Sequence, residues 1–308
     1  MIKTETSHTI NPPIKKIDPP IKMINPQIKK KIWSVNAHDG AVVRTAVYEP
    51  KGHYKGVVQL VHGFGEGIEH YQDLAGFFVS NNFACVIHDQ RGFGQMPGLS
   101  VKQKKAARGI VPRYEYFLED IKTIRHKINQ WYPSLPVVLF GHSMGGNIAI
   151  NCLLKNFEYS KAVIEAPWLR LYRPLPKSAM SVVKFLGRIF PKITASSKIR
   201  TSHIARNGEK IRALKDDGIF HNRISFKLFS EISDAGEFAL KNAALINLPT
   251  LLLCPGADKI VCPDAIREFG QNARENLKMI DYKDGYHNLH SDSISTTVLD
   301  DIMEFMQN

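Results

Sequence analysis

Residues 136–150 read "PVVLFGHSMGGNIAI". A continuous apolar run ends in Gly-His-Ser-Met-Gly around Ser143, and a second apolar segment follows at once. The pattern fits G-x-S-x-G at a strand-to-helix junction, where a strained turn exposes the serine and the glycines let strand and helix approach closely. Serine alone is a poor nucleophile. The stretch therefore predicts that a base, an acid and an oxyanion site lie elsewhere in the chain.

The overall composition is typical of a globular protein. The chain has 308 residues, 44% of them apolar and 23% charged, and it can bury a large core as one elaborated domain or as two. It contains no apolar run of membrane-spanning length, and its N-terminus lacks the apolar region of a secretory signal. Four cysteines do not suggest a disulfide framework. We expect buried thiols and a cytoplasmic location.

The positive charge is concentrated in two segments. The formal net charge is +12, to which residues 1–32 contribute +5 and residues 166–227 contribute +11, so the rest of the chain is acidic at −4. A general nucleic-acid binder would carry its basic residues on its main recognition element. The distribution instead indicates an anionic surface or substrate, and we expect no nucleic-acid partner.

The N-terminal tail contains a short internal repeat. Residues 10–30 include "INPPIKK", "IDPPIKM" and "INPQIKK", and the prolines forbid a coiled coil despite the period of seven. We expect residues 1–31 to be a disordered, basic, semi-rigid linker in an extended polyproline II conformation. The alternative is a tether to anionic lipid through its lysines.

From Ile32 onward, apolar strands alternate with amphipathic helices. Strands apolar on both faces predict a mostly parallel sheet with helices on both sides, and its functional groups should lie at the carboxyl ends of the strands. The alternation is interrupted after "IEAP". We therefore expect a core in two parts, residues 32–165 and 228–308, with residues 166–227 inserted as a helical cap.

The acid and the base should follow the nucleophile in the order Ser, Asp or Glu, His. Asp258 comes directly after the apolar strand in "PTLLLCPGAD", and His287 lies in the turn after the strand in "NLKMIDYKDG". We predict Asp258 as the acid and His287 as the base. His290 is the other candidate base, and its alternative interpretation is a supporting polar residue. Three further acids near the histidine are interpreted as solvated loop residues: Asp281, Asp284 and Asp292.

The backbone N–H groups of Phe64 and Met144 are the predicted oxyanion donors. Phe64 lies in a Gly-rich turn after a strand, and Met144 directly follows the nucleophile. The "GFGEG" turn superficially resembles a dinucleotide loop, but it lacks the G-x-G-x-x-G spacing and the acidic residue about 20 positions later. No metal-ligand pattern is present either. The sequence predicts neither a cofactor nor a metal.

The chain resembles the serine α/β-hydrolases of the monoacylglycerol lipase and lysophospholipase group over residues 32–308. Five motifs carry the resemblance, in the order and spacing of that group: "HGFGEGIEHYQDLA", "DQRGFG", "GHSMGG", "GADKIV" and "GYHNLH". The resemblance implies an α/β-hydrolase fold with Ser143 as nucleophile, Asp258 as acid, His287 as base and oxyanion donors at positions 64 and 144. Two motifs depart from the family: Phe93 and Met96 replace a histidine and a serine, and Gly67 replaces a histidine.

The expected substrate is an ester of a lipid-like acyl chain, as in a monoacylglycerol or a lysophospholipid. The segment 177–190 has apolar residues spaced for one helix face and is flanked by basic residues, which suggests peripheral contact with an anionic membrane. A small-ester or thioester hydrolase without lipid preference is the alternative. A non-catalytic ligand-binding protein is the weaker one, because every member of the predicted triad is present.

Overall fold

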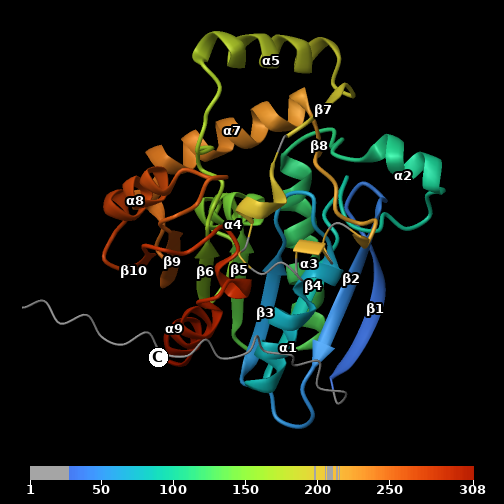
Figure 1. Ribbon diagram of the computed structural model, residues 1–308. Coiled ribbons are helices and arrows are strands. Elements are labelled where there is room, and N and C mark those ends of the chain that lie inside the picture. The colour runs from blue at the N-terminus through green and yellow to red at the C-terminus, as the bar shows by residue number, and fades with distance from the viewer. Residues whose placement is uncertain (1–27, 198, 205, 207–210, 213, 215) are drawn as a thin grey trace, which may run out of the picture.

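The computed structural model describes residues 28–197, 199–204, 206, 211–212, 214 and 216–308 (Figure 1). The tail repeats lie outside these residues apart from their last positions. The tail's expected disorder, and its role as linker or lipid tether, therefore stay predictions.

An eight-stranded sheet forms the centre of the described structure, in the order β1-β2-β4-β3-β5-β6-β9-β10. β1 and β2, and β2 and β4, pair antiparallel, and every other neighbouring pair is parallel. The predicted mostly parallel sheet is confirmed. Its strands are β1 (Lys29–Asn36), β2 (Val42–Glu49), β3 (Gly56–Val61), β4 (Phe83–His88), β5 (Val137–His142), β6 (Lys161–Glu165), β9 (Thr250–Pro255) and β10 (Leu277–Tyr282).

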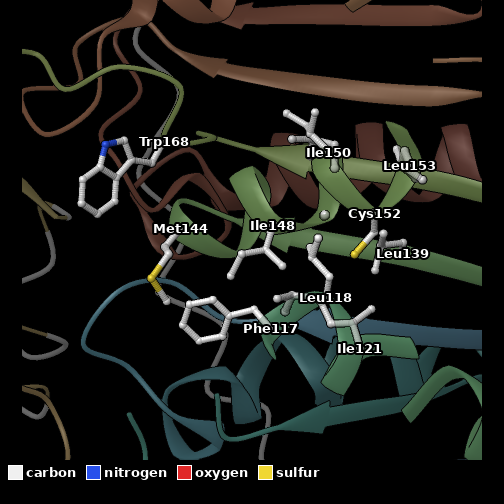
Figure 2. Packing of buried hydrophobic residues seen from close by; sticks show 14 of the residues in the cluster. Phe117, Leu118, Ile121, Leu139, Met144, Ile148, Ile150, Cys152, Leu153 and Trp168 are labelled. Carbon is white, nitrogen blue, oxygen red and sulfur yellow. The ribbon is translucent and has the colours of Figure 1, made fainter. Parts of the chain in front are cut away.

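Helices cover both faces of the sheet, as the apolar strands require. Helices α1 (Gln72–Ser80) and α9 (Ser295–Gln307) pack their buried residues into one apolar cluster, and α3 (Glu115–Trp131), α4 (Met144–Leu154) and α8 (Pro263–Asn272) pack into the other. Figure 2 shows Ile148 of α4 facing Phe117 and Leu118 of α3 in this second cluster. The predicted α/β layers place the end of β5 and the start of α4 at the centre of the molecule.

The first strand begins earlier than we expected. We placed residues 29–31 in the tail, but they belong to β1 and pair with β2. β1 is an edge strand, so its lysines keep their ammonium groups at the surface, and Lys31 Nζ lies 2.8 Å from Glu49 Oε2. Edge strands commonly carry lysine, and this is why the run of lysines did not end the strand.

The insertion is also less purely helical than we predicted. It contains helix α5 (Lys177–Ile189), close to the expected 177–190, but also strands β7 (Thr194–Ser196) and β8 (Arg223–Ser225), which pair antiparallel. Helix α7 (Phe226–Lys241) crosses the expected boundary at residue 228. Figure 1 shows α5 at the top of the molecule, above α7 and beyond the end of the central sheet.

None of the helices in the described part of the chain combines the length and the apolar character that a bilayer-spanning segment needs.

Candidate active site

Ser143 occupies a strained turn between β5 and α4. Its backbone has φ 56° and ψ −117°, a region that residues other than glycine rarely adopt. Three backbone hydrogen bonds hold it there: Ser143 donates to Glu165 (3.0 Å) and accepts from Asn147 (3.0 Å) and Trp168 (2.9 Å). The side chain therefore projects from a turn that β6 and the start of α4 fix in place.

The two glycines of the motif allow backbone segments to touch. A Cβ atom at Gly145 would lie 2.2 Å from the carbonyl oxygen of Val61 in β3, and one at Gly141 would lie 2.6 Å from the carbonyl oxygen of Gly145. Both separations are shorter than real Cβ contacts. The close approach of strand and helix expected from the sequence is thus present at both positions.

The structure brings Ser143, His287 and Asp258 into one hydrogen-bonded chain. His287 Nε2 lies 2.8 Å from Ser143 Oγ, and His287 Nδ1 lies 2.6 Å from Asp258 Oδ2. All three residues are buried, and each follows the carboxyl end of a strand, respectively β5, β10 and β9. The other oxygen of Asp258 accepts the backbone N–H groups of Ile260 (2.6 Å) and Val261 (3.1 Å), which orient the carboxylate toward the imidazole.

The electrostatics favour a basic imidazole. Burial by itself lowers the pKa of His287, but the adjacent Asp258 carboxylate outweighs burial, so this pKa lies above its usual value. The Asp258 contact requires the proton on Nδ1, which leaves Nε2 free to accept the Ser143 hydroxyl proton.

His290, the alternative base, is turned away from the serine. Its Nδ1 lies 2.9 Å from both carboxylate oxygens of the buried Glu165. Of the rival acids, Asp281 is exposed and pairs with Arg267, and Asp284 is exposed too. Asp292 differs from the expected solvated residue: it is buried and accepts the backbone N–H of Tyr286 (3.1 Å), so it holds the histidine loop in shape.

Of the two predicted oxyanion donors, Phe64 lines the same pocket as Ser143, and Met144 directly follows Ser143 in the chain. Within the described residues, neither the N–H of Phe64 nor that of Met144 has a hydrogen-bond acceptor. Met144 is the first residue of α4, where an N–H has no partner inside the helix. Gly63, next to Phe64, is so close to the nucleophile that a Cβ on it would lie 3.3 Å from Ser143 Cβ.

A buried network that no sequence pattern indicated holds this loop. The carboxylate of Glu66 accepts hydrogen bonds from the Gly63 N–H (2.9 Å) and the Tyr71 hydroxyl (2.6 Å), and the same hydroxyl lies 2.8 Å from His142 Nδ1. Burial raises the pKa of Glu66, but the His142 imidazole and the Tyr71 hydroxyl more than offset this and keep the carboxyl ionised. Glu66 was visible only as the acid three residues after Gly63 in "HGFGEG".

Two of the residues that depart from the family motifs, Phe93 and Gly67, have local packing explanations. Phe93 is buried, stacks on the ring of His221 (5.1 Å between centroids) and contacts Phe64 edge-on (5.5 Å). A Cβ at Gly67 would lie 2.8 Å from the Cα of Gly94, so this tight loop admits no side chain without a shift. Phe93 therefore packs against the loop that carries the predicted oxyanion donor Phe64.

Ser143 lines one small pocket, which shares lining residues with two larger hollows. The serine pocket itself measures about 30 Å³ and includes Ser143, Phe64 and His287 in its lining. Trp168 and Leu171 also line a cap groove of about 570 Å³ between α5 and α7. On another side, the serine pocket shares Glu66, Ile204 and Asn288 with a polar cavity of about 290 Å³. The polar lining of this cavity includes Glu69, His70, Asp73, Asp217, His290 and Ser291.

Comparison with known proteins places this fold among α/β-hydrolases. The model of the Hydrolase_4 family, described as serine aminopeptidase S33, matches residues 52–294. The chain is 27% identical to the monoglyceride lipase of Mus musculus, covering 89% of each protein. It is 25% identical to an uncharacterized abhydrolase domain-containing protein of Dictyostelium discoideum, covering 87% of this chain but only 28% of that relative's length.

A solved structure with the same fold is a soluble variant of monoglyceride lipase from Saccharomyces cerevisiae, in complex with a substrate analog. The TM-score is 0.81 at 20% identity, and the match covers 94% of this chain and 98% of the other. The expected α/β-hydrolase fold and the resemblance to the monoacylglycerol lipase group are confirmed.

Proposed function

Since the chain belongs to the Hydrolase_4 (serine aminopeptidase S33) family, we propose that it is a serine hydrolase that cleaves carboxylic esters of lipid-like substrates. The observation that carries the proposal is the buried chain of hydrogen bonds from Asp258 through His287 to Ser143. The Mus musculus relative, 89% of which the match covers, is named a monoglyceride lipase. This name favours an ester over a peptide as the substrate.

In the proposed reaction, His287 Nε2 takes the hydroxyl proton of Ser143 while Oγ attacks the ester carbonyl. Asp258 holds the imidazole in the required tautomer and stabilises its protonated form. The carbonyl oxygen becomes an oxyanion, which the N–H groups of Phe64 and Met144 stabilise. His287 then returns the proton to the leaving alcohol, and water, activated by the same imidazole, hydrolyses the acyl-enzyme.

The dimensions of the hollows favour an extended substrate. A pocket of about 30 Å³ has room for little more than the reacting ester group, so the acyl chain must continue beyond it. The cap groove is much larger and shares Trp168 and Leu171 with the serine pocket. Trp168, which lines both hollows, packs edge-on against Phe64, with 6.2 Å between the ring centroids. A small ester would leave this groove unused.

We further propose that α5 contacts the surface of an anionic membrane. Four large apolar side chains of this region are about half exposed or more: Val182, Phe185, Ile189 and Phe190. Lys177, Lys184, Arg188 and Lys192 accompany them on or next to the same helix. An exposed apolar stripe with flanking cations is typical of helices that lie in the membrane interface. Such contact would bring an ester substrate from the lipid phase to the cap groove.

Labelling with a fluorophosphonate probe tests the catalytic proposal. We expect the wild type to be labelled and to hydrolyse a monoacylglycerol, whereas Ser143→Ala should lose labelling and at least about 10⁴-fold in kcat/KM. A substrate panel of monoacylglycerols, lysophospholipids and short p-nitrophenyl esters tests the substrate class. Unchanged hydrolysis by Ser143→Ala would contradict the mechanism, and a preference for short esters would contradict the lipid-like substrate.

A further inference from the structure

Arg206 of the insertion contacts the loop that carries His287. This histidine loop runs over residues 283–294, between β10 and α9. The central carbon of the Arg206 guanidinium group lies 4.6 Å from the centroid of the Tyr286 ring, which is a cation–π contact. The same group donates a hydrogen bond to the backbone carbonyl oxygen of Asp284. Arg206 thus holds the chain at two points just before the proposed base.

A buried carboxylate links Arg206 to the histidine loop a third time. Asp292 is 3% exposed, and its two oxygens accept the backbone N–H groups of Tyr286 (3.1 Å) and Arg206 (3.3 Å). Arg206 Nε lies 3.8 Å from the carboxylate and belongs to its only cationic partner among the residues that the structure describes. Burying a carboxylate is costly unless hydrogen bonds and a nearby cation compensate it. The conformation of the histidine loop therefore depends on a residue outside the loop.

The insertion also holds the chain just after His287. The carbonyl oxygen of Ile204 accepts the backbone N–H of Asn288 (2.9 Å), and both residues line the serine pocket. His287 therefore lies between two sequence neighbours, Tyr286 and Asn288, that the insertion contacts. The base is fixed from the insertion as well as from the core, where its imidazole meets Asp258.

The proposed proton transfer requires this placement to be accurate. His287 Nε2 lies 2.8 Å from Ser143 Oγ, which is the separation that lets the imidazole accept the hydroxyl proton. A displacement of about 1 Å, caused by a change away from the reacting atoms, can cost about 100-fold in rate. Arg206 is absent from the lining of the serine pocket, so it can affect the reaction only through the histidine loop.

We propose that Arg206 is a positioning residue for His287, so that the base stays within reach of the nucleophile only while the insertion is docked on the histidine loop. This inference rests on the proposed hydrolase activity. It gives the insertion a part in the chemical step, in addition to the substrate and membrane contacts proposed for the cap groove and α5. Loss of the Arg206 side chain should therefore slow the hydrolysis of a small soluble ester, which needs neither of those surfaces.

The test uses p-nitrophenyl butyrate, a soluble short-chain ester. We expect Arg206→Ala to lower kcat about 10-fold and to leave KM within about twofold, because the reacting geometry changes while the pocket lining does not. Arg206→Lys keeps a cation beside Asp292 and over the Tyr286 ring, and it should recover most of the loss. The matched control Arg173→Ala removes another exposed arginine of the insertion, one that lines neither the serine pocket nor the two larger hollows, and should keep the wild-type kcat.

A double-mutant cycle with Tyr286→Leu tests whether Arg206 acts through the histidine loop. Tyr286→Leu removes the ring beneath the guanidinium group but keeps the backbone N–H that Asp292 accepts. If Arg206 acts through this ring, the double variant should lose less in kcat than the product of the two single losses. The rate of fluorophosphonate labelling should follow kcat in every variant, because labelling of Ser143 needs the same base.

The outcomes are distinct. A lower kcat with KM unchanged, recovery by Arg206→Lys and non-additive losses with Tyr286→Leu support the inference. A kcat of Arg206→Ala equal to that of Arg173→Ala would overturn it. Fully additive losses would overturn it too, as would a fall in kcat that urea unfolding explains by a matching loss of folded protein. A wild type that neither hydrolyses the ester nor is labelled would instead contradict the proposed function itself.

Discussion

His290 binds the buried carboxylate of Glu165, with 2.9 Å between its Nδ1 and each carboxylate oxygen. The backbone carbonyl of the same Glu165 accepts the N–H of Ser143 (3.0 Å), so one backbone hydrogen bond joins the pair to the nucleophile. Burial raises the pKa of Glu165, but the His290 imidazole outweighs burial, and the carboxyl stays ionised. The pair therefore links the strand beside the nucleophile to the loop that carries His287.

Removing His290 should destabilise the protein strongly, because it leaves a buried carboxylate without its partner. We expect His290→Ala to lower the free energy of unfolding by about 3 kcal/mol. Urea unfolding followed by circular dichroism measures the change. The matched control His53→Ala, at an exposed loop position, should change it by less than about 0.5 kcal/mol. Equal stability of the two variants would show that the pair is not an important contact.

The pH dependence of activity should report the raised pKa of His287. The base must be neutral to accept the serine proton, so activity is lost as the pH falls through this pKa. Because Asp258 holds the pKa above the usual value of about 6.5, the acid limb of kcat/KM should have its midpoint above about pH 6.5. The contribution of the His287–Asp258 ion pair to stability has the opposite pH dependence. The pair favours the folded state below about pH 6.5, and this contribution is lost as the pH rises through the pKa of His287 in the folded protein. A pH–rate profile with a soluble ester measures the limb, and a midpoint at or below 6.5 would argue against a paired base.

Sequence patterns could predict the positions of the proposed triad because each lies next to a strong local signal. Ser143 follows an apolar run, and Asp258 and His287 follow two more strands, so the parallel sheet alone places all three at one edge. The choice of His287 over His290 needed only the turn pattern around the histidine. The fold followed from the same alternation.

Other features had no local signal. The contact between Tyr71 and His142 joins residues 71 positions apart, and the hydrogen bond from Arg206 to Asp292 joins residues 86 positions apart. Strands β7 and β8 have three residues each, too few for an alternating pattern to appear. Lys29 was assigned to the tail because a run of lysines resembles a solvated segment, whereas an edge strand accepts it equally well.

A methyl group at Gly145 should disrupt the nucleophile turn. Its Cβ would meet the backbone oxygen of Val61 at 2.2 Å, and a backbone atom in a central strand cannot move aside. We expect Gly145→Ala to lower the free energy of unfolding by about 3 kcal/mol and to abolish fluorophosphonate labelling. The control Gly270→Ala in α8 meets side-chain atoms only, Met279 Sδ at 2.8 Å and Leu252 Cδ2 at 3.3 Å, and should cost much less because side chains can shift where a strand backbone cannot. Normal labelling of Gly145→Ala would show that the turn tolerates a wider separation.

Phe185 should matter for substrates held in a membrane and not for soluble ones. It is 63% exposed on α5 and contributes apolar surface that the proposed membrane contact would bury. We expect Phe185→Asp to lower the hydrolysis rate of a monoacylglycerol in anionic vesicles about 10-fold or more, and to leave a soluble short-chain ester unaffected. The matched control Leu245→Asp changes a side chain that is 52% exposed, on the turn between α7 and β9, and should leave both rates unchanged. Because Phe185 is absent from the linings of the serine pocket and the cap groove, equal losses on both substrates would mean that α5 acts through the packing of the insertion rather than through lipid.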